Sequence, residues 1–404
     1  MLLHLLAVAL DVRLPSLTED VCQTVDWESV ANESIHQTVS SLVFEAACAY
    51  ETFIPPTVYE RWLSVAYGYM RHAQMTLCCQ RHLNDIMDKN GHPFIILKGT
   101  AAAAYYPQPE KRCFGDVDFL IDTTQRAAVE ALLSADGYER WSSEHICHVV
   151  YRKGKQHLEM HFETVGIPYG RSGELVREWM QGAVVDSIIQ TVGDVAFPAP
   201  GPKYHALILL LHMQHHALSE GLGLRHLCDW AVFVDRTANE PFWDEEVLPL
   251  LKKIGLYTYA AAMTKTAATY LHTACPIWAR NVDESLCGRL IEDILTGGNF
   301  GRKDDVRAAS GMLISEHGKA GTRHGVVYNL AHTLHGAVLL QYPIIKKLPF
   351  LYPFLYMYKI VRFGVLRLCG KRLSLMKRLP YAKERKALYA RLKVFETQDD
   401  EVTK

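Results

Sequence analysis

The chain has 404 residues, of which 49% are hydrophobic and 22% are charged. This balance is typical of a globular protein and excludes a low-complexity or disordered chain, while the length favours two or three structural units. Ten cysteines include no C-x-x-C spacing, which indicates neither a zinc knuckle nor a thioredoxin-like motif. We expect them to be reduced thiols in the core.

Two apolar stretches bear on location. The first ten residues lack a basic region and a small-residue cleavage site, so we expect no secretory signal and a cytoplasmic protein. Gly325 to Ile345 carries no charge and has the length of a membrane span. Its apolar run is interrupted by Asn329, His332, His335, Gln341 and Pro343. We expect a buried or interfacial helix there.

The first long predicted element is a helix over Thr57 to Lys89, with apolar positions at helical spacing and a stop at Asn90-Gly91. Pro93 to Leu97 follows as a short apolar run that fits a buried strand. It ends at Lys98-Gly99, after which Thr100 is expected to cap a short helix through Tyr106.

A second strand is predicted over Val117 to Ile121. Side chains two apart on a strand point to the same face, so Asp116 and Asp118 are expected to present their carboxylates together. Thr123-Thr124 then caps a predicted helix through Ser134, which Gly137 ends.

Two further strands are predicted over 145–152 and 156–162, joined by a turn at 153–155. The order of strands and helices between 91 and 170 predicts an α+β fold, with a mixed sheet flanked by N-terminal and C-terminal helical regions. Beyond about Gly170 the sequence becomes mostly helical, with helices expected over 204–218, 224–237 and 257–272. Pro198 to Pro202 has the character of a linker. The expected units are an N-terminal helical region (1–90), a core (91–170), a helical domain (171–340) and a basic aromatic arm (341–404).

The carboxylates suggest metal-dependent phosphate chemistry. Transfer of a nucleotidyl group needs divalent cations that hold the triphosphate, and hard oxygen ligands bind such cations. Asp116 and Asp118 supply two carboxylates, and Glu159 is the expected third because it would point inward from the last predicted strand. Glu163 and Asp122 are weaker candidates for the third position. The site would take two magnesium ions, or manganese in their place.

Donors for phosphate lie on the preceding turn. Gly99 permits close backbone approach, and the helix that opens at Thr100 offers free amides. Lys98 and Arg112 would add positive charge, although a lysine at this place can equally be a solvated strand end. An Asp-x-Asp pair alone arises often by chance. Its combination with the turn and with Glu159 is what indicates a nucleotide site.

These residues resemble a family. The motifs that carry the resemblance are Leu97-Lys98-Gly99, Tyr105-Tyr106-Pro107, Arg112, Gly115 to Ile121 and Gly137-Tyr138. They are similar to the uncharacterised bacterial nucleotidyltransferases of the DNA polymerase beta-like superfamily, and the similarity extends in weaker form over 1–363. The resemblance implies a polymerase beta-like core.

The resemblance also implies the activity. A nucleoside monophosphate would pass from a nucleoside triphosphate such as ATP to an acceptor hydroxyl, with loss of pyrophosphate. Asp116, Asp118 and Glu159 would bind magnesium, Glu159 would help to deprotonate the acceptor, and Gly99 and Thr100 would hold the phosphates. Two features depart from the superfamily pattern, because Thr100 stands where serine is commoner and fifteen residues separate it from Asp116. The second leaves the acceptor open among small molecules, peptides and protein side chains.

Other activities remain open. The fold could serve as a non-catalytic nucleotide-binding or interaction module, or it could transfer the γ-phosphate instead. Five histidines, His205, His212, His215, His216 and His226, could hold a metal, but no H-E-x-x-H and no His-Asp dipeptide of the phosphohydrolase kind occurs. Packing or cleft roles are therefore favoured. Arg225 and Asp229, four apart, are expected to form an ion pair within one helix.

The net charge of −1 conceals an asymmetry. Residues 341–395 hold fourteen Lys or Arg and one acidic residue, a net +13, which leaves −14 for the remainder. Aromatic residues alternate with these cations, a mixture suited to an anionic membrane surface. Nucleic acid is the less favoured partner, and the arm could also be a solvated or docking face.

Overall fold

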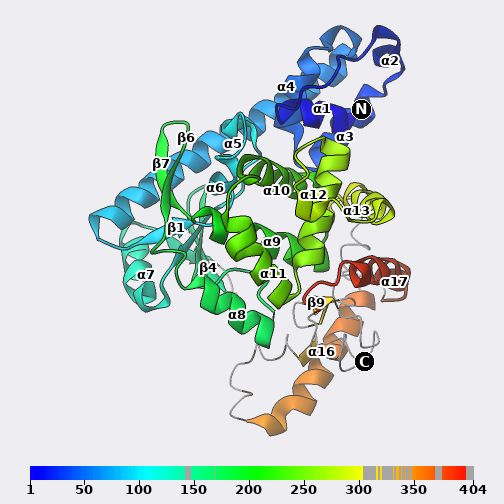
Figure 1. Cartoon of the computed structure of the whole chain (residues 1–404). Coiled ribbons are helices and arrows are strands. Elements are labelled where there is room, and N and C mark those ends of the chain that lie inside the picture. The colour runs from blue at the N-terminus through cyan, green and yellow to red at the C-terminus, as the bar shows by residue number, and fades with distance from the viewer. Residues whose placement is uncertain are drawn as a thin grey trace.

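The computed structural model describes residues 1–141, 147–168, 170–303, 348–368 and 375–396, with short pieces between 315 and 345. It confirms the α+β fold, with a mixed sheet whose strands are preceded and followed along the sequence by helical regions (Figure 1). The helix predicted over 325–345 lies almost wholly outside the described residues. No helix in the described part of the chain is long and apolar enough to cross a bilayer.

The N-terminal region is helical. It contains α1 (Leu2–Ala9), α2 (Glu19–Thr24), α3 (Trp27–His36), α4 (Ser40–Cys48) and a 3-10 turn, η1 (Glu51–Phe53). The long helix α5 (Pro56–Lys89) follows and confirms the predicted helix. Its proline suits the first turn of a helix, and Gly91 takes a left-handed φ of +68° after its end.

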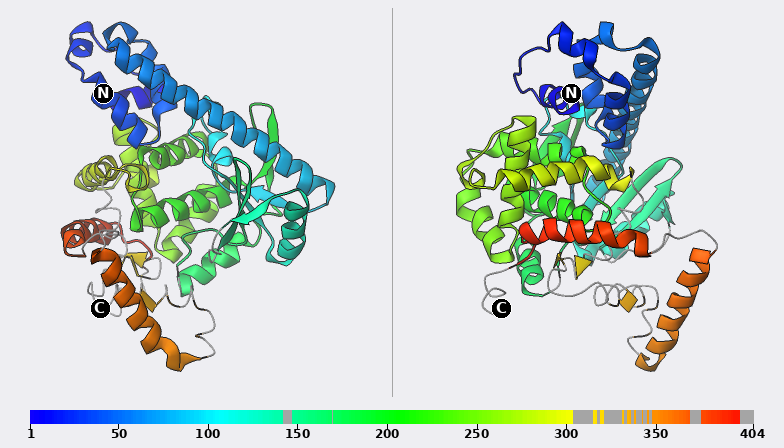
Figure 2. Two further views of the ribbon diagram at one scale, coloured as in Figure 1. Left: turned by 180° about the vertical axis from the view of Figure 1, so that it is seen from behind. Right: turned by 90° about the vertical axis from the view of Figure 1, so that its right-hand side faces the viewer.

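Helix α5 joins two hydrophobic clusters. Its first half packs Trp62 and Ala66 among the N-terminal helices, while its second half packs Leu77 and Leu83 against the sheet. Figure 2 shows this helix extending from the N-terminal bundle across the sheet. The N-terminal bundle is therefore fixed to the sheet by one continuous helix.

The main sheet has five strands in the order β1-β2-β5-β4-β3. They are β1 (Phe94–Ile96), β2 (Val117–Ile121), β3 (Glu139–Trp141), β4 (His148–Lys153) and β5 (Gln156–His161). Strands β2 and β5 run parallel and the other neighbours are antiparallel, so the sheet is mixed as predicted. The short strand β3 was not predicted.

The turns between the strands differ in detail from the predictions. Helix α6 (Thr100–Ala103) ends before Tyr106. Helix α7 (Arg126–Ala135) is preceded by a 3-10 turn, η3 (Thr123–Gln125), and the carboxylate of Asp122 accepts the amide of Thr124. The cap is therefore Asp122 and not the threonine pair. A second 3-10 turn, η2 (Pro109–Lys111), precedes β2.

A hairpin stands where a helical region and a linker were expected. After α8 (Arg171–Met180), strands β6 (Ile188–Val192) and β7 (Val195–Ala199) pair antiparallel, with Pro198 opposite Ile189. Proline is tolerated in such a two-stranded edge. Phe197 joins the sheet's hydrophobic cluster, which is why this segment folds onto the sheet instead of forming a linker.

The helical domain follows. It consists of α9 (Pro202–Leu218), α10 (Leu224–Thr237), the π-helical turn η4 (Trp243–Val247), α11 (Leu248–Ile254), α12 (Tyr257–Leu271), η5 (Ile277–Ala279), α13 (Glu284–Gly297) and η6 (Asn299–Gly301). The three predicted helices α9, α10 and α12 are confirmed. The remaining described elements are β8 (Ser315–Glu316), β9 (Lys319–Ala320), η9 (Pro349–Leu351), α16 (Tyr352–Leu368) and α17 (Leu375–Arg391).

The two faces of the sheet have different neighbours. Val117, Phe119 and Met160 point into the cluster that contains α5 and the hairpin. Ile95 and Leu120 point the other way and pack with Tyr204 and Ile208 of α9. Because side chains two apart on a strand share a face, Asp118 lies on the same face as Leu120 and points toward the helical domain.

Candidate functional site

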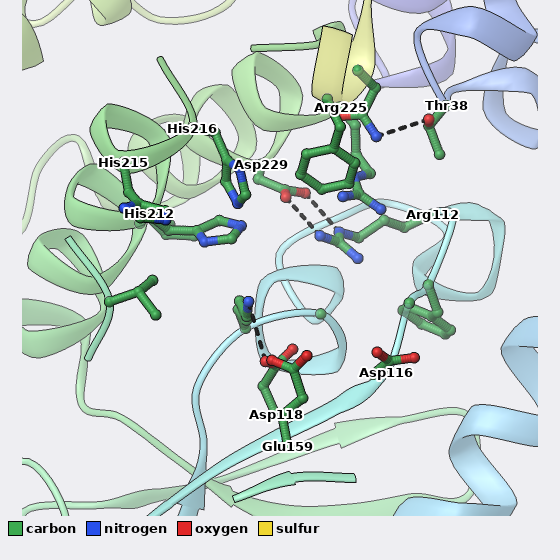
Figure 3. Close-up of a pocket in the computed structure, with 18 of the residues that line it drawn as sticks. Thr38, Arg112, Asp116, Asp118, Glu159, His212, His215, His216, Arg225 and Asp229 are labelled. Carbon is green, nitrogen blue, oxygen red and sulfur yellow. Dashed lines mark hydrogen bonds and ion pairs between the residues drawn. The ribbon is translucent and has the colours of Figure 1, made fainter. Parts of the chain in front are cut away.

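A cavity of about 590 Å³ lies between the sheet and helices α9 and α10. Figure 3 shows carboxylates on its sheet side and histidines and arginines on its helical side. From the sheet side it is lined by Lys98, Gly99, Asp116, Asp118, His148 and Glu159. From the helical side it is lined by His212, His215, His216, Glu220, Arg225 and Asp229.

The three predicted carboxylates lie together in this cavity. Asp118 and Glu159 are in register on the parallel strands β2 and β5, and Asp116 stands just before β2. Burial raises the pKa of Asp116 and of Glu159, and the charge of Asp118 raises both further. Such raised pKa values are the signature of carboxylates that repel one another in a partly desolvated site.

Two cationic side chains stabilise Asp118. Lys98 Nζ lies 3.1 Å and His161 Nε2 3.0 Å from the same oxygen, Asp118 Oδ1. Burial by itself would raise the pKa of Asp118, but Lys98 and His161 outweigh it and hold that pKa below its usual range. His161 also lies 3.5 Å from Glu159 Oε2. Burial lowers the pKa of His161, and its bonds to the two carboxylates raise it by more.

Sequence reasoning missed His161. The signal was present, because His161 follows Glu159 by two positions on one strand and must share its face. The weaker candidates for a third carboxylate lie elsewhere. Asp122 caps the turn before α7, and Glu163 pairs with Arg177. Among the three candidates, Glu159 is the one whose carboxylate lies beside Asp118.

Only part of the predicted phosphate-binding turn lines the cavity. Lys98 and Gly99 line the cavity, and Gly99 takes a φ of +63°, which favours glycine. Thr100 is 3% exposed and is not among the residues that line the cavity. Lys98 is no solvated strand end, since its ammonium group contacts Asp118.

Arg112 lines the cavity but is engaged by a carboxylate. Its Nε and Nη2 each donate to one oxygen of Asp229 over 2.6 Å, and Tyr106 donates its hydroxyl to the same carboxylate over 2.8 Å. Both members of the ion pair are buried. The ion pair expected between Arg225 and Asp229 within one helix is wrong, because Arg112 from the loop before β2 takes that place.

Arg225 is consequently left as a buried cation without a carboxylate within 4 Å in the described part of the chain. It is 9% exposed, its Nη1 donates to Cys113 O over 3.4 Å, and its guanidinium lies 5.4 Å from the ring centre of Phe300. Burial lowers the pKa of Arg225, and repulsion from Arg112 lowers it further. A desolvated guanidinium on a cavity wall is a strong site for an anion.

The histidines fall into two groups. His205 is fully buried and packs against Tyr105 and Phe233 with ring centres 5.4 and 5.6 Å away, and burial lowers its pKa to about 3. Its role is packing, as expected. His212, His215 and His216 instead line the cavity.

One comparison with known proteins identifies a family for this chain. Residues 23–272 match the profile of a family described as uncharacterised nucleotidyltransferase. The chain belongs to this family. Neither the curated proteins nor the solved structures contain a match. The family assignment confirms the resemblance seen in the motifs, although the match is shorter than the expected 1–363.

The matched span contains both walls of the cavity in this nucleotidyltransferase family member. It includes the carboxylates of the sheet side and the histidines and Arg225 of the helical side. Phe300 and Arg302, which line the cavity near η6, lie beyond the matched span. The main part of the site thus belongs to the shared domain.

Proposed function

We propose that the domain moves a nucleoside monophosphate from a nucleoside triphosphate to an acceptor hydroxyl and releases pyrophosphate. The supporting observation is one cavity in which Asp116, Asp118 and Glu159 stand opposite the buried cation Arg225. Its size of about 590 Å³ falls in the range of small-molecule sites. A triphosphate has the negative charge to bind between these two walls. Divalent cations at the carboxylates would contact it on one side, and Arg225 would contact its terminal oxygens on the other.

The carboxylates suit divalent cations. Asp116, Asp118 and Glu159 offer hard oxygens from adjacent strands, and Lys98 and His161 compensate their charge only in part. Two Mg²⁺ ions, or Mn²⁺, would be held by these three residues. Ions bound there would neutralise the triphosphate and align the attacking and leaving oxygens.

The side chains of the protein account for orientation and proton transfer. The acceptor oxygen forms a bond to the α-phosphorus while the bond between that phosphorus and the bridging oxygen of the pyrophosphate breaks. Glu159 accepts the hydroxyl proton, since its carboxylate lies in the cavity, in register with Asp118. Lys98 and the backbone at Gly99 contact phosphate oxygens, and the Arg112–Asp229 pair fixes the loop before β2.

The position of the label in the product tests this proposal. Purified protein with Mg²⁺ is given triphosphates labelled at the α- or the γ-phosphate, with water, small hydroxyl compounds and the protein itself as acceptors. Release of pyrophosphate and transfer of the α-label support nucleotidyl transfer. Transfer of the γ-label would instead show a phosphotransferase, and saturable binding without any product would show a non-catalytic module.

Substitution of Arg225 tests the proposed contact with the phosphates. Arg225→Gln is expected to weaken triphosphate binding on the order of 10- to 100-fold, because a charge-assisted bond to phosphate is worth about 1.5–3 kcal/mol. Binding of the corresponding nucleoside, which has no phosphate, should hardly change. Calorimetric titration with both ligands measures the difference. Equal losses for the two would show that Arg225 acts on the shape of the cavity and not on the phosphates.

We also propose that α16 rests on an anionic membrane surface. Phe354, Met357, Tyr358 and Val361 follow one helical face and are each at least half exposed. Arg362 is exposed beside them, within the segment of net charge +13. A helix with exposed apolar side chains among cations is suited to the boundary between lipid headgroups and acyl chains.

Vesicle sedimentation checks this surface. The full chain is expected to bind vesicles of phosphatidylcholine with phosphatidylglycerol, and added salt should weaken the binding. Phe354→Ser with Val361→Ser should reduce it by at least about tenfold, since each buried apolar side chain contributes about 1.5–3 kcal/mol. Tyr67→Ser, an exposed aromatic of α5, is the matched control. Equal binding to neutral vesicles, or no effect of the double substitution, would contradict the assignment.

A further inference from the structure

Three histidines from two helices form a compact group, of which His212 and His216 line the cavity. His212 and His216 are one turn apart on α9, and His226 stands in the first turn of α10. One nitrogen from each lies within 4.8 Å of the other two. The ring centres are 4.4 Å apart for His212 and His216, and 5.3 Å for each of the other two pairs.

Packing does not account for the polar atoms of this group. His212 Nδ1, His216 Nδ1 and His226 Nε2 are buried and have no hydrogen-bond partner among the residues that the structure describes. His226 is only 1% exposed. An unsatisfied buried polar atom costs about 1–3 kcal/mol, so a ligand that pairs with all three atoms would stabilise the group.

The protonation state of the group suits metal binding. Burial lowers the pKa of all three histidines well below the ordinary value, and neighbouring cations, among them Lys98 and Arg225, lower the pKa of each further. Neutral imidazoles are the form that ligates metals, and zinc is a metal that three imidazoles bind well. Phe300 packs beside the rings of His216 and His226, with ring centres 4.6 and 5.4 Å away.

A fourth ligand, a carboxylate oxygen, lies close to the group. The carboxylate of Glu220 lies 3.9 Å from His216 Nδ1, and Glu220 lines the same cavity as His212 and His216. Closing the three nitrogens onto one ion asks for a modest side-chain shift, since nitrogens that share a zinc lie roughly 3.3 Å apart. Ligation through His226 Nε2 would also give up a long bond of 3.4 Å from the amide of Gly223 to His226 Nδ1.

We propose that His212, His216 and His226 bind one zinc ion, with Glu220 or a molecule in the cavity completing its coordination. The ion would lie on the wall opposite Asp118 and Glu159 (Figure 3). This site is distinct from the carboxylates proposed to bind magnesium. It does not depend on the nucleotidyl transfer proposed above.

Metal titration of the untagged full chain tests the site. Protein freed of metal by a chelator is titrated with Zn²⁺ against a chromophoric competitor, and one equivalent is expected to bind. The double substitution His216→Gln with His226→Gln should weaken zinc binding more than loss of an outer-shell partner does. That loss weakens metal binding by about 10- to 100-fold. His215→Gln, on the same helix and cavity wall but outside the trio, should leave it unchanged.

Two further arms locate the ion. Asp116→Asn with Asp118→Asn should retain the zinc, and loss of zinc there would place the ion at the carboxylates and overturn the proposal. Co²⁺ added to the wild-type chain should give the visible bands of nitrogen and oxygen ligation, a readout that does not depend on whether the histidine variants fold. A thiolate charge-transfer band, or no uptake of either metal, would equally overturn it.

Discussion

Asp118→Asn is expected to lower nucleotidyl transfer on the order of a thousandfold or more. The substitution keeps the shape of the side chain and removes the charge from Asp118, which is only 6% exposed. Loss of a single group that stabilises charge in a dry site costs about 10²–10³ in rate, and loss of a metal ligand adds to this. Pyrophosphate release under saturating Mg²⁺ and triphosphate measures the effect.

The contacts of Asp118 explain why it should matter more than its neighbours. Lys98 and His161 both bind its Oδ1, and Glu159 is its partner in register across the two parallel strands. Changing Asp118 therefore disturbs the whole cluster, whereas the side chain of Asp116, at the edge of the cluster, is 41% exposed against 8% for that of Asp118. Asp122→Asn is the matched control, because Asp122 is exposed and caps a turn at the other end of β2. Full activity of the Asp118→Asn variant would show that the charge of Asp118 is not needed for the reaction.

Asp229→Asn is expected to destabilise the protein by about 3–5 kcal/mol, because breaking a buried ion pair leaves the remaining charge without compensation. Here the remaining charge is the guanidinium of Arg112, whose two bonds to Asp229 are replaced by one weaker contact at best. Tyr106 and Arg112 Nε donate to the same oxygen, Oδ1, which asparagine can keep, so the loss falls on the charge and on the bond from Nη2 to the second oxygen. Urea unfolding followed by fluorescence measures the change as a shift of the midpoint at constant slope.

An exposed ion pair provides the comparison. Glu174 lies 3.5 Å from Arg171 in α8, and both side chains are largely exposed. Glu174→Gln should therefore change the stability by less than about 0.5 kcal/mol. Similar small shifts for both variants would mean that water reaches Arg112 and that the pair does not fix the loop before β2.

Local pattern predicted the part of the fold that holds the carboxylates. The strand Val117–Ile121 and the helix ending at Lys89 are confirmed, because each has apolar residues at one clear period and a sharp stop. The pairing of Asp118 with Glu159 could also be expected from local pattern. The alternation of side chains along each strand fixes which of them face inward.

Features that depend on distant parts of the chain were not predictable in this way. The hairpin of β6 and β7 was not predicted: it lies in the expected helical domain, and its end overlaps the linker predicted at Pro198 to Pro202. Its packing on β1 and α5 makes it a pair of strands. Arg112 and Asp229 are 117 positions apart, so no local spacing could indicate that Arg112 would displace Arg225 as the partner of Asp229. His226 joins His212 and His216 for the same reason, through the crossing of two helices.

A crystal structure with Mn²⁺ and a triphosphate that cannot be cleaved at the α-phosphate tests the central claim most directly. Anomalous scattering should place manganese between Asp116, Asp118 and Glu159, with the triphosphate bound to it and its terminal oxygens near Arg225. Manganese or triphosphate bound away from these three carboxylates would contradict the account.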